Sequence, residues 1–155
     1  MMQQTETRVE QATLEDLPKL TDLLVELFAE EEDFEPNPDR QERGLRLVLE
    51  EPSRGRIFVI RTDHSIIGMV NVLFTISTAS GGFVILMEDV IVHPAHRGQG
   101  YGSKLMKYVV DYARKKDLLR ITLLTDKISD ESQRFFQNHG FQFSHMIPMR
   151  LMLDD

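Results

Sequence analysis

Apolar residues recur at helical spacing in two stretches near the N-terminus. Within residues 14–28 they fall three or four positions apart, after residues 13–16, which have the residue types of a capping box. A second helix is expected to start at Asn37 or Pro38 and to end before Pro52. The pattern therefore predicts two amphipathic helices that pack against a sheet.

The rest of the chain alternates between strand and helix patterns. Runs rich in β-branched and apolar residues are separated by glycine, proline and polar turns, and two stretches return to helical spacing. We expect strands at 8–12, 57–61, 66–77, 83–92, 121–125 and 146–153, and further helices at 103–116 and 132–138. Antiparallel strands followed by a strand-helix-strand crossover predict a mixed α/β sheet covered by helices.

A glycine-rich turn joins the strand at 83–92 to the long helix. Pro94 ends the strand, and helical spacing resumes after the last glycine of the turn. Gly98, Gly100 and Gly102 stand where the helix begins, so its unpaired backbone N–H groups are accessible to a ligand. With the helix dipole and a neighbouring arginine, this arrangement predicts a phosphate-binding loop.

The spacing of these glycines distinguishes among known phosphate-binding loops. The dinucleotide fingerprint has glycines at its first, third and sixth positions, whereas here they occupy the first, third and fifth. A Walker A loop ends in Gly-Lys-Ser or Gly-Lys-Thr, and this loop ends in Gly-Ser-Lys. A sharp turn that binds no ligand is the other interpretation.

Two blocks of the sequence resemble the GNAT family of N-acetyltransferases. The segment 97–102 resembles its Gln/Arg-x-x-Gly-x-Gly/Ala signature, which holds the pyrophosphate of acetyl-CoA. A second block resembles Asp-x-x-Asn-x-x-Ala-x-x-Phe-Tyr-x-x-x-Gly-Phe, with Ser129, Ser132 and Phe136 replacing its Asn, Ala and Tyr. The resemblance covers residues 58–141 and implies the family's acyl-CoA N-acyltransferase fold, with about six or seven strands and about four helices.

The resemblance also implies acetyl-CoA as co-substrate and assigns residues that bind it. In the family the strand before the loop pairs with the pantetheine arm and supplies a backbone N–H to the developing oxyanion. The cofactor-binding residues expected on this basis are Val90, Ile91, Val92, Arg97, Gly98, Gln99, Gly100, Tyr101, Gly102, Ser103, Ser129, Ser132, Phe135 and Phe136.

Two adjacent carboxylates, Glu88 and Asp89, are the expected catalytic residues. A primary amine with a pKa near 10 is mostly protonated at neutral pH, so acetyl transfer needs a base. The Glu-Asp pair resembles that of polyamine and glucosamine-phosphate acetyltransferases, which makes Glu88 the first choice. Adjacent strand residues point to opposite faces, so both carboxylates face the amine only if a bulge intervenes. The other interpretation makes each an ion-pair partner within the sheet.

Phe136 departs from the family pattern at a chemically important position. The family's tyrosine there protonates the leaving thiolate, which a phenylalanine side chain cannot do. Ser132 lies one helical turn earlier and His145 lies beyond Gly140, so either can substitute directly or through water. The alternative is a non-catalytic, regulatory module that retains acetyl-CoA binding.

Composition narrows the class of protein. A chain of 155 residues with 41% apolar residues suits one globular domain over residues 1–155. The formal charge of −7 disfavours a nucleic-acid partner, and we expect a cytoplasmic protein without a membrane partner. Without cysteine, transfer must be direct rather than through a protein thiol. His93 and His96 lack a third ligand at suitable spacing, so no metal site is expected.

An acidic segment predicts the character of the acceptor. Residues 30–35 contain five carboxylates around Phe34, between the first two helices, where the family builds one wall of its acceptor site. Such a wall attracts cations. We therefore expect a small amine substrate, with a cationic one favoured. A homodimer is, separately, the expected form of assembly. A solvated charge run at a helix end is the other interpretation.

Overall fold

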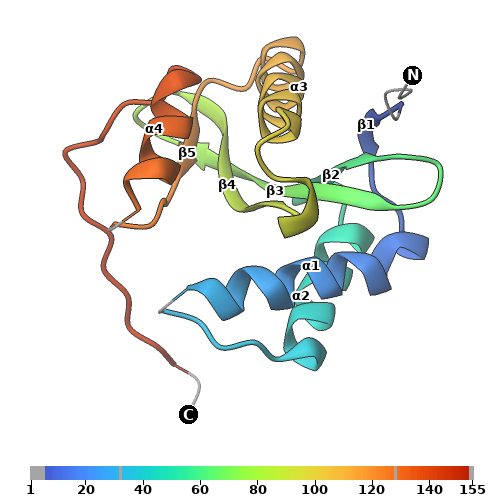
Figure 1. The fold of residues 1–155 in the computed structure, drawn as a ribbon. Helices are drawn as coiled ribbons and strands as arrows, with labels where there is room; N and C mark the ends of the chain where they lie inside the picture. Colours follow the sequence, from blue (N-terminus) through green and yellow to red (C-terminus); the bar gives the residue numbers. More distant parts are fainter. Residues whose placement is uncertain (1–5, 32, 128, 154–155) are drawn as a thin grey trace. The chain divides into compact units, whose positions relative to one another are not determined.

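The computed structural model describes residues 6–31, 33–127 and 129–153. These residues divide into two compact units, one that ends at Leu124 and one that begins at Thr125 (Figure 1). We describe each unit by itself. A single domain over residues 1–155 stays a prediction.

The first unit is built on a five-stranded mixed sheet. Strands β1 to β4 pair with their neighbours antiparallel, whereas β5 runs parallel to β4. The sheet is therefore of the predicted mixed type, with one or two strands fewer than expected. In spatial order, which is also chain order, the strands are β1 (Arg8–Gln11), β2 (Gly55–Arg61), β3 (Ile66–Ser77), β4 (Gly82–Val92) and β5 (Ile121–Leu123).

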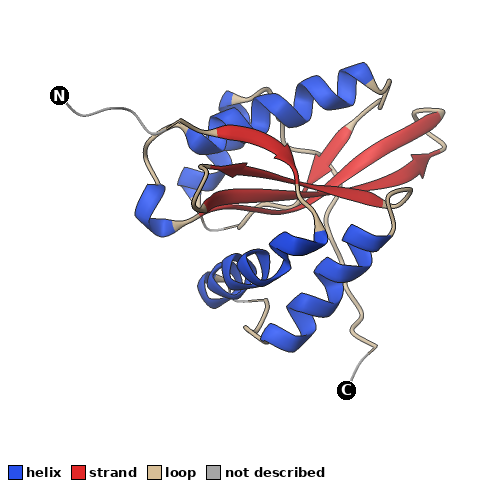
Figure 2. Cartoon of the chain, turned by 90° about the vertical axis from the view of Figure 1, so that its right-hand side faces the viewer, coloured by secondary structure: helices blue, strands red, loops and turns tan. Residues whose placement is uncertain are grey.

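Helices cover both faces of this sheet (Figure 2). One face is covered by α1 (Leu17–Glu30) and α2 (Pro38–Glu50), and the other by α3 (Tyr101–Lys115). Short 3₁₀ turns precede α1, at Leu14–Asp16, and follow β4, at Pro94–His96. All three predicted helices of this unit are confirmed.

Alternation along β3 decides which side chains meet which helices. A side chain added at Gly68 would meet Leu105 of α3, so this residue faces α3. Met69 belongs instead to the core cluster formed with leucines of α1 and α2. Successive strand residues point to opposite faces, so Val70 faces α3 and Asn71 faces α1 and α2. The same alternation fixes the side on which the neighbouring strands present their residues.

The second unit has one helix among its described residues, α4 (Asp130–Asn138). Ser129 caps it, because its side-chain oxygen accepts a hydrogen bond from the Ser132 backbone N–H at 3.2 Å. Gly140 lies just past its end at φ 93°, a conformation that favours glycine. This helix agrees with the prediction for 132–138.

The predicted final strand at 146–153 is wrong. The structure assigns no strand to these residues, although their side chains are mostly apolar. A strand needs a neighbour to complete its hydrogen bonds, and the described residues of the second unit include no other strand. Pro148 further weakens the segment, because it lacks a backbone N–H.

A nearly buried ion pair joins the start of α1 to β2. Arg61 donates to Asp16 through both terminal nitrogens, at 2.8 and 2.7 Å. The hydrogen bond from Arg61 is the main cause that lowers the pKa of Asp16 below its ordinary value of 3.8. Asp16 also accepts from the Thr13 backbone N–H, so the pair ties the helix start to the sheet.

We expect Asp16→Asn to reduce the free energy of unfolding by about 1.5–3 kcal/mol at pH 7, because a hydrogen bond between charged groups is lost. The folded pKa of Asp16 is lowered, so its contribution is present above the unfolded value and is lost as pH falls through the folded value. Urea unfolding at pH 7 and pH 3 should show a difference that shrinks in acid. Asp63→Asn, which removes an exposed partner of Arg8, is the control and should change little.

Candidate active site

A bulge in β4 lies opposite Asn71. The register between β3 and β4 shifts between the pairs that contain Val70 and Val72. As a result two residues of β4, Glu88 and Asp89, lie opposite the single residue Asn71 of β3. One extra residue on one strand is the defining feature of a β-bulge.

The bulge places both carboxylates on the same side of the sheet. Met87 and Val90 each pair with a β3 residue that faces α3, so both face α3 although they are three positions apart. Glu88 follows Met87 and Asp89 precedes Val90, so both point toward the side of α1 and α2. From the sequence, both carboxylates could face one substrate only if a bulge intervened, and the structure contains that bulge.

The two carboxylates differ in environment. Asp89 is half-buried, and its Oδ2 accepts a hydrogen bond from Asn71 Nδ2 at 3.2 Å. Burial raises the pKa of Asp89, and the hydrogen bonds from Asn71 and from its own backbone N–H partly oppose this. Glu88 is exposed. Asp89 therefore has the environment of a carboxylate whose proton affinity is increased, as a general base requires.

The outer edge of β4 loses its strand partner near the bulge. Pairing between β4 and β5 ends at Met87 and Leu123, whereas β4 continues to Val92. The residues of β4 after Met87 thus have β3 on one side and no described strand of the first unit on the other. The pairing of the two parallel strands therefore ends before β4 does.

The alternation of hydrogen bonds along β4 shows which residues direct their backbone groups toward that outer edge. The backbone N–H of His93 donates to the carbonyl of Ile67 at 2.7 Å, so this pair is of the hydrogen-bonded kind. Such pairs alternate in an antiparallel ladder, so Ile91 also directs its backbone toward β3. Val90 and Val92 direct their N–H and carbonyl groups outward. Of the three residues predicted to make backbone contacts, Val90 and Val92 direct their backbone groups away from β3, whereas Ile91 directs its own toward β3.

The glycine turn leads directly into α3. Gly98 and Gly100 have φ values of 78° and 85°, which side chains rarely adopt. A Cβ added at either would have no atom within 4 Å, so the space above them is open. Gly100 is the N-cap and supplies no side chain to the first turn, which has no acidic residue. The N-terminus of α3 is thus suited to bind an anion.

Arg97 lies beside this turn but points back along the strand. Its Nε donates to the Val92 carbonyl at 3.0 Å, and its Nη2 donates to Glu30 of α1 at 3.1 Å. Both charged side chains are about half exposed. Because an exposed ion pair is weak, a phosphate group can compete with Glu30 for this guanidinium.

The other residues predicted at the turn continue from it into the helix. Gln99 lies within the loop, and Tyr101, Gly102 and Ser103 form the first turn of α3. Lys104 adds a positive charge there, with its ammonium 5.6 Å from the centre of the Tyr101 ring. The turn and the beginning of the helix therefore keep the composition expected of an anion site.

Four predicted residues belong to the second unit. Ser129 and Ser132 are joined by a hydrogen bond between their hydroxyls at 3.0 Å. Phe135 and Phe136 contact each other edge to face, with ring centres 5.2 Å apart, and Phe136 also contacts Phe141. The hydroxyl of Ser132 and the ring of Phe136 thus come from the same short helix, as their spacing predicted.

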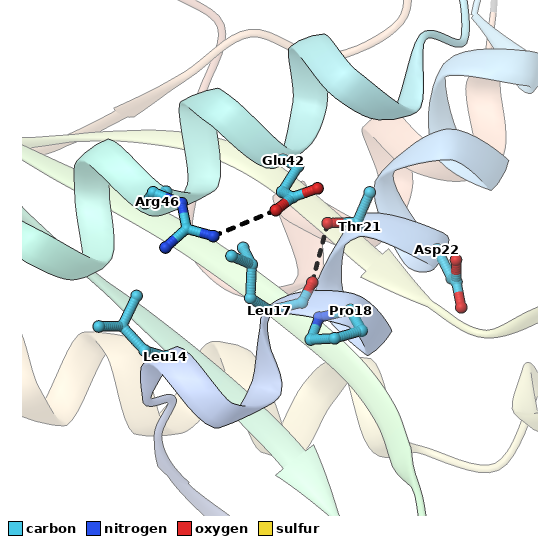
Figure 3. A pocket seen from close by; sticks show the side chains of 7 residues that line it. All are labelled: Leu14, Leu17, Pro18, Thr21, Asp22, Glu42 and Arg46. Carbon is cyan, nitrogen blue, oxygen red and sulfur yellow. Dashed lines mark hydrogen bonds and ion pairs between the residues drawn. The ribbon is translucent and has the colours of Figure 1, made fainter.

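A surface pocket of about 410 Å³ lies elsewhere, between α1 and α2 (Figure 3). Its lining includes none of the predicted site residues. Two of its charged side chains are engaged with each other, since Arg46 donates to Glu42 at 3.2 Å. This pocket is therefore separate from the residues of the candidate site on β4. The lining residues are Leu14, Leu17, Pro18, Thr21, Asp22, Glu42 and Arg46.

No group of three or more His, Asp or Glu side chains within the described ranges is placed to bind a metal ion. His93 instead accepts a hydrogen bond from the Ala95 backbone N–H at 3.1 Å. Of the helices in the described part of the chain, none is both long and apolar enough to cross a membrane.

Asn71 is the residue of this site that sequence reasoning missed. It is 7% exposed and lies within an otherwise apolar strand, between Val70 and Val72. A lone amide in an apolar strand is a signal, because buried polar groups need partners. Its partner Asp89 is 18 residues away, so the sequence did not indicate which group it would meet.

Comparison with known proteins places this geometry in context. A model of the acetyltransferase (GNAT) family matches residues 17–141. The aminoalkylphosphonate N-acetyltransferase of Salmonella typhimurium is 25% identical over 134 residues, which cover 86% of this chain and 84% of that protein.

Solved structures share the fold. A transcriptional regulator from Bacillus halodurans is 26% identical with a TM-score of 0.78, covering 94% of this chain and 100% of that chain. An aminoglycoside N-acetyltransferase solved in complex with CoA has a TM-score of 0.81 at 16% identity, covering 98% of both chains. Because the identity is only 16%, the similarity to the aminoglycoside N-acetyltransferase shows the fold alone.

We expect Asp89→Asn to raise the thermal stability of the protein at pH 7. A folded pKa above the unfolded value means that stability is lost as pH rises through this interval, because the buried carboxylate must ionise. The neutral asparagine avoids that cost and keeps an acceptor for Asn71. The increase in Tm should be on the order of a few degrees at pH 7 and should shrink at pH 4. An unchanged Tm at pH 7 would contradict the assigned environment of Asp89.

Proposed function

The chain belongs to the acetyltransferase (GNAT) family, and we propose that it moves the acetyl group of acetyl-CoA directly to the primary amine of a small molecule or peptide. The observation that carries this proposal is the course of β4. Within one strand and its following turn, β4 combines a bulged carboxylate pair, an outward-facing backbone edge and an anion-binding helix start.

Acetyl-CoA fits these features from one end to the other. The open space above Gly98 and Gly100 accommodates a diphosphate, which the N–H groups of the first turn of α3 bind. Arg97 gives up its ion pair with Glu30 and binds the diphosphate instead. The outward N–H groups of Val90 and Val92 and the outward carbonyl of Val90 pair with the amide groups of the pantetheine arm, as an added strand would. The thioester then lies near the bulge.

Asp89 acts as the base and Val90 stabilises the developing charge. The carboxylate takes a proton from the acceptor ammonium and becomes a neutral acid, which leaves the nitrogen lone pair free to attack the thioester carbonyl. The outward N–H of Val90 donates to the carbonyl oxygen as it becomes negative. The nitrogen of the tetrahedral intermediate then gives up a second proton to solvent as the carbon–sulfur bond breaks, and the thiolate of CoA leaves with the electron pair.

Protonation of that thiolate does not depend on a tyrosine in this chain. Phe136 has no proton to donate, but a thiol of pKa about 8–9 is a fair leaving group without help. Ser132 carries a hydroxyl one helical turn earlier and is the nearest substitute in the sequence. We therefore expect a slower chemical step than in relatives with the tyrosine, rather than none.

The charge of the α1 C-terminal region supports a cationic acceptor. Glu30 ends α1, and Glu31, Asp33 and Glu35 follow within the described residues, whereas Glu32 lies outside them. A local excess of carboxylates attracts an ammonium ion and repels an anionic group. By this reasoning an aminoalkylphosphonate, named for the Salmonella relative, is a weaker candidate here than a polyamine or an aminoglycoside.

The second candidate function is a non-catalytic acetyl-CoA-binding module with a regulatory role. Two observations favour it: Phe136 in place of the family's tyrosine, and the likeness to a protein described as a transcriptional regulator. Release of free thiol from acetyl-CoA in the presence of amines separates the two candidates. Binding of CoA without thiol release from any amine tested would favour the module. A homodimer and a cytoplasmic location stay predictions.

We expect Gly100→Glu to abolish CoA binding, because a carboxylate would occupy the place of the diphosphate. Gly81→Glu is a matched control: its φ is 80°, its added side chain also meets no atom within 4 Å, and it lies in the β3–β4 hairpin. At 100 times Kd, CoA should stabilise the wild type and the control by about 2.7 kcal/mol, but not Gly100→Glu. Equal stabilisation of both variants would refute the phosphate-binding loop.

We expect Asp89→Asn to lose on the order of 10²–10⁴-fold in kcat while keeping its affinity for CoA. Thiol release should be measured against a polyamine, an aminoglycoside, an amino sugar, an aminoalkylphosphonate and a peptide. Glu88→Gln is the comparison, and its loss should be smaller because Glu88 is the exposed member of the pair. The reverse order of losses would reassign the base to Glu88, the sequence-based first choice.

A further inference from the structure

Asn71 has one satisfied and one unsatisfied end. Its Nδ2 donates to Asp89, but its buried Oδ1 has no hydrogen-bond partner within the part of the chain that the structure describes. A buried acceptor without a donor is destabilising, so each such atom in a native protein calls for an explanation. The side chain is more than nine-tenths buried, so bulk water does not supply that donor freely.

The position of this amide distinguishes it from a buried polar group that serves the fold alone. Thr21 is equally buried at 7%, and its hydroxyl is paired because it donates to the Leu17 carbonyl. Asn71 instead stands opposite the bulge, where the strand widens to hold two residues. Its free oxygen and the carboxylate of Asp89 lie on the same face of the sheet.

We propose that Asn71 is a positioning residue for the acetyl transfer, which holds the Asp89 carboxylate through Nδ2 and receives a proton donor of the acceptor amine through Oδ1. This inference rests on the proposed function. In this arrangement the Asn71 amide oxygen and the Asp89 carboxylate together accept hydrogen bonds from two of the three N–H groups of an ammonium ion. The sequence had assigned the amine to the carboxylates alone.

The proton balance of the step is consistent with this division of roles. One N–H proton moves to Asp89, whose carboxylate becomes a carboxylic acid, and a second N–H bond stays intact on Asn71 Oδ1. The amine nitrogen is then neutral, with its lone pair directed at the thioester carbonyl. Fixing the nitrogen between two acceptors restricts its rotation, which is how positioning groups accelerate a reaction.

Few charged groups compete with Asn71 for control of Asp89. Burial, the Asn71 amide and the backbone N–H of Asp89 itself are the causes that shift its pKa. Glu88 is the ionisable neighbour on β4. Two carboxylates of α1, which packs on β3 and β4, have partners in the segment just before the start of α3: Arg97 Nη2 lies 3.1 Å from Glu30, and His93 Nε2 lies 4.0 Å from Glu26. Removing the amide should therefore change the titration of Asp89 directly.

The test compares Asn71→Leu and Asn71→Asp with wild type, and Thr21→Val is the control of equal burial. Asn71→Leu removes donor and acceptor at similar size, and Asn71→Asp keeps acceptors but loses the donor. Because the Asn71 hydrogen bond lowers the pKa of Asp89, its loss should raise that pKa. Carboxyl ¹³C NMR of the folded proteins measures this titration, and steady-state kinetics of the wild-type substrates measures kcat and KM.

We expect both Asn71 variants to lose on the order of 10–100-fold in kcat/KM at pH 7 and to move the acid limb of the pH profile to higher pH. Part of the loss should be recovered at alkaline pH, where Asp89 is again ionised, and Kd for CoA should stay unchanged. Thr21→Val should keep the wild-type profile. If Asn71 had only a structural role, kcat/KM would fall by the same factor at all pH values.

The outcomes separate this inference from the proposed function. If wild type binds CoA but transfers acetyl to no amine, the proposed transferase function fails, and the NMR titration still decides whether Asn71 controls Asp89. If wild type is active and Asn71→Leu keeps both its pH profile and the pKa of Asp89, the positioning role is overturned. An unchanged acceptor KM in a slow Asn71→Leu variant would overturn the contact between Oδ1 and the amine.

Discussion

The pairing constraint on β4 is the feature on which the site depends. β4 must stay hydrogen-bonded to β3 along its length while it carries two adjacent carboxylates out of the apolar layer beneath α3. In a regular strand one of them would point at the fully buried Leu105 and Met106, where an ionised group is strongly disfavoured. One extra residue opposite Asn71 removes this conflict. The bulge therefore preserves the core and creates the site at once.

A second consequence is that β4 has a carboxylate at the bulge and leads to the positive N-terminus of α3 at its other end. At the bulge, burial increases the proton affinity of Asp89. At the far end, the positive N-terminus of α3 follows glycines that leave its backbone accessible. The outward edges of Val90 and Val92 connect these two regions. In the proposed function, the N-terminus of α3 binds the diphosphate of acetyl-CoA, and the thioester lies near Asp89.

Much of this arrangement was predictable from sequence because it is local. The glycine turn, the start of α3 and the cap of α2 at Asn37 are set by residues a few positions apart, and each was predicted. Backbone conformation at such points depends on which residues tolerate a positive φ or supply a capping oxygen. The family resemblance likewise rests on short blocks with fixed spacing. The final strand failed because an apolar run does not specify the strand with which it pairs.

The sequence by itself thus determined the helices, the mixed character of the sheet and the glycine turn that precedes α3. Only the tertiary structure decided that Asn71 meets Asp89, that β5 leaves β4 after Met87, and that Arg97 lies on Glu30, 67 residues away. It also gave Asp89, rather than the exposed Glu88, a half-buried environment that raises its pKa. Such features arise from strand register and burial, which sum contacts over the whole sheet, and no local pattern of residue types encodes them.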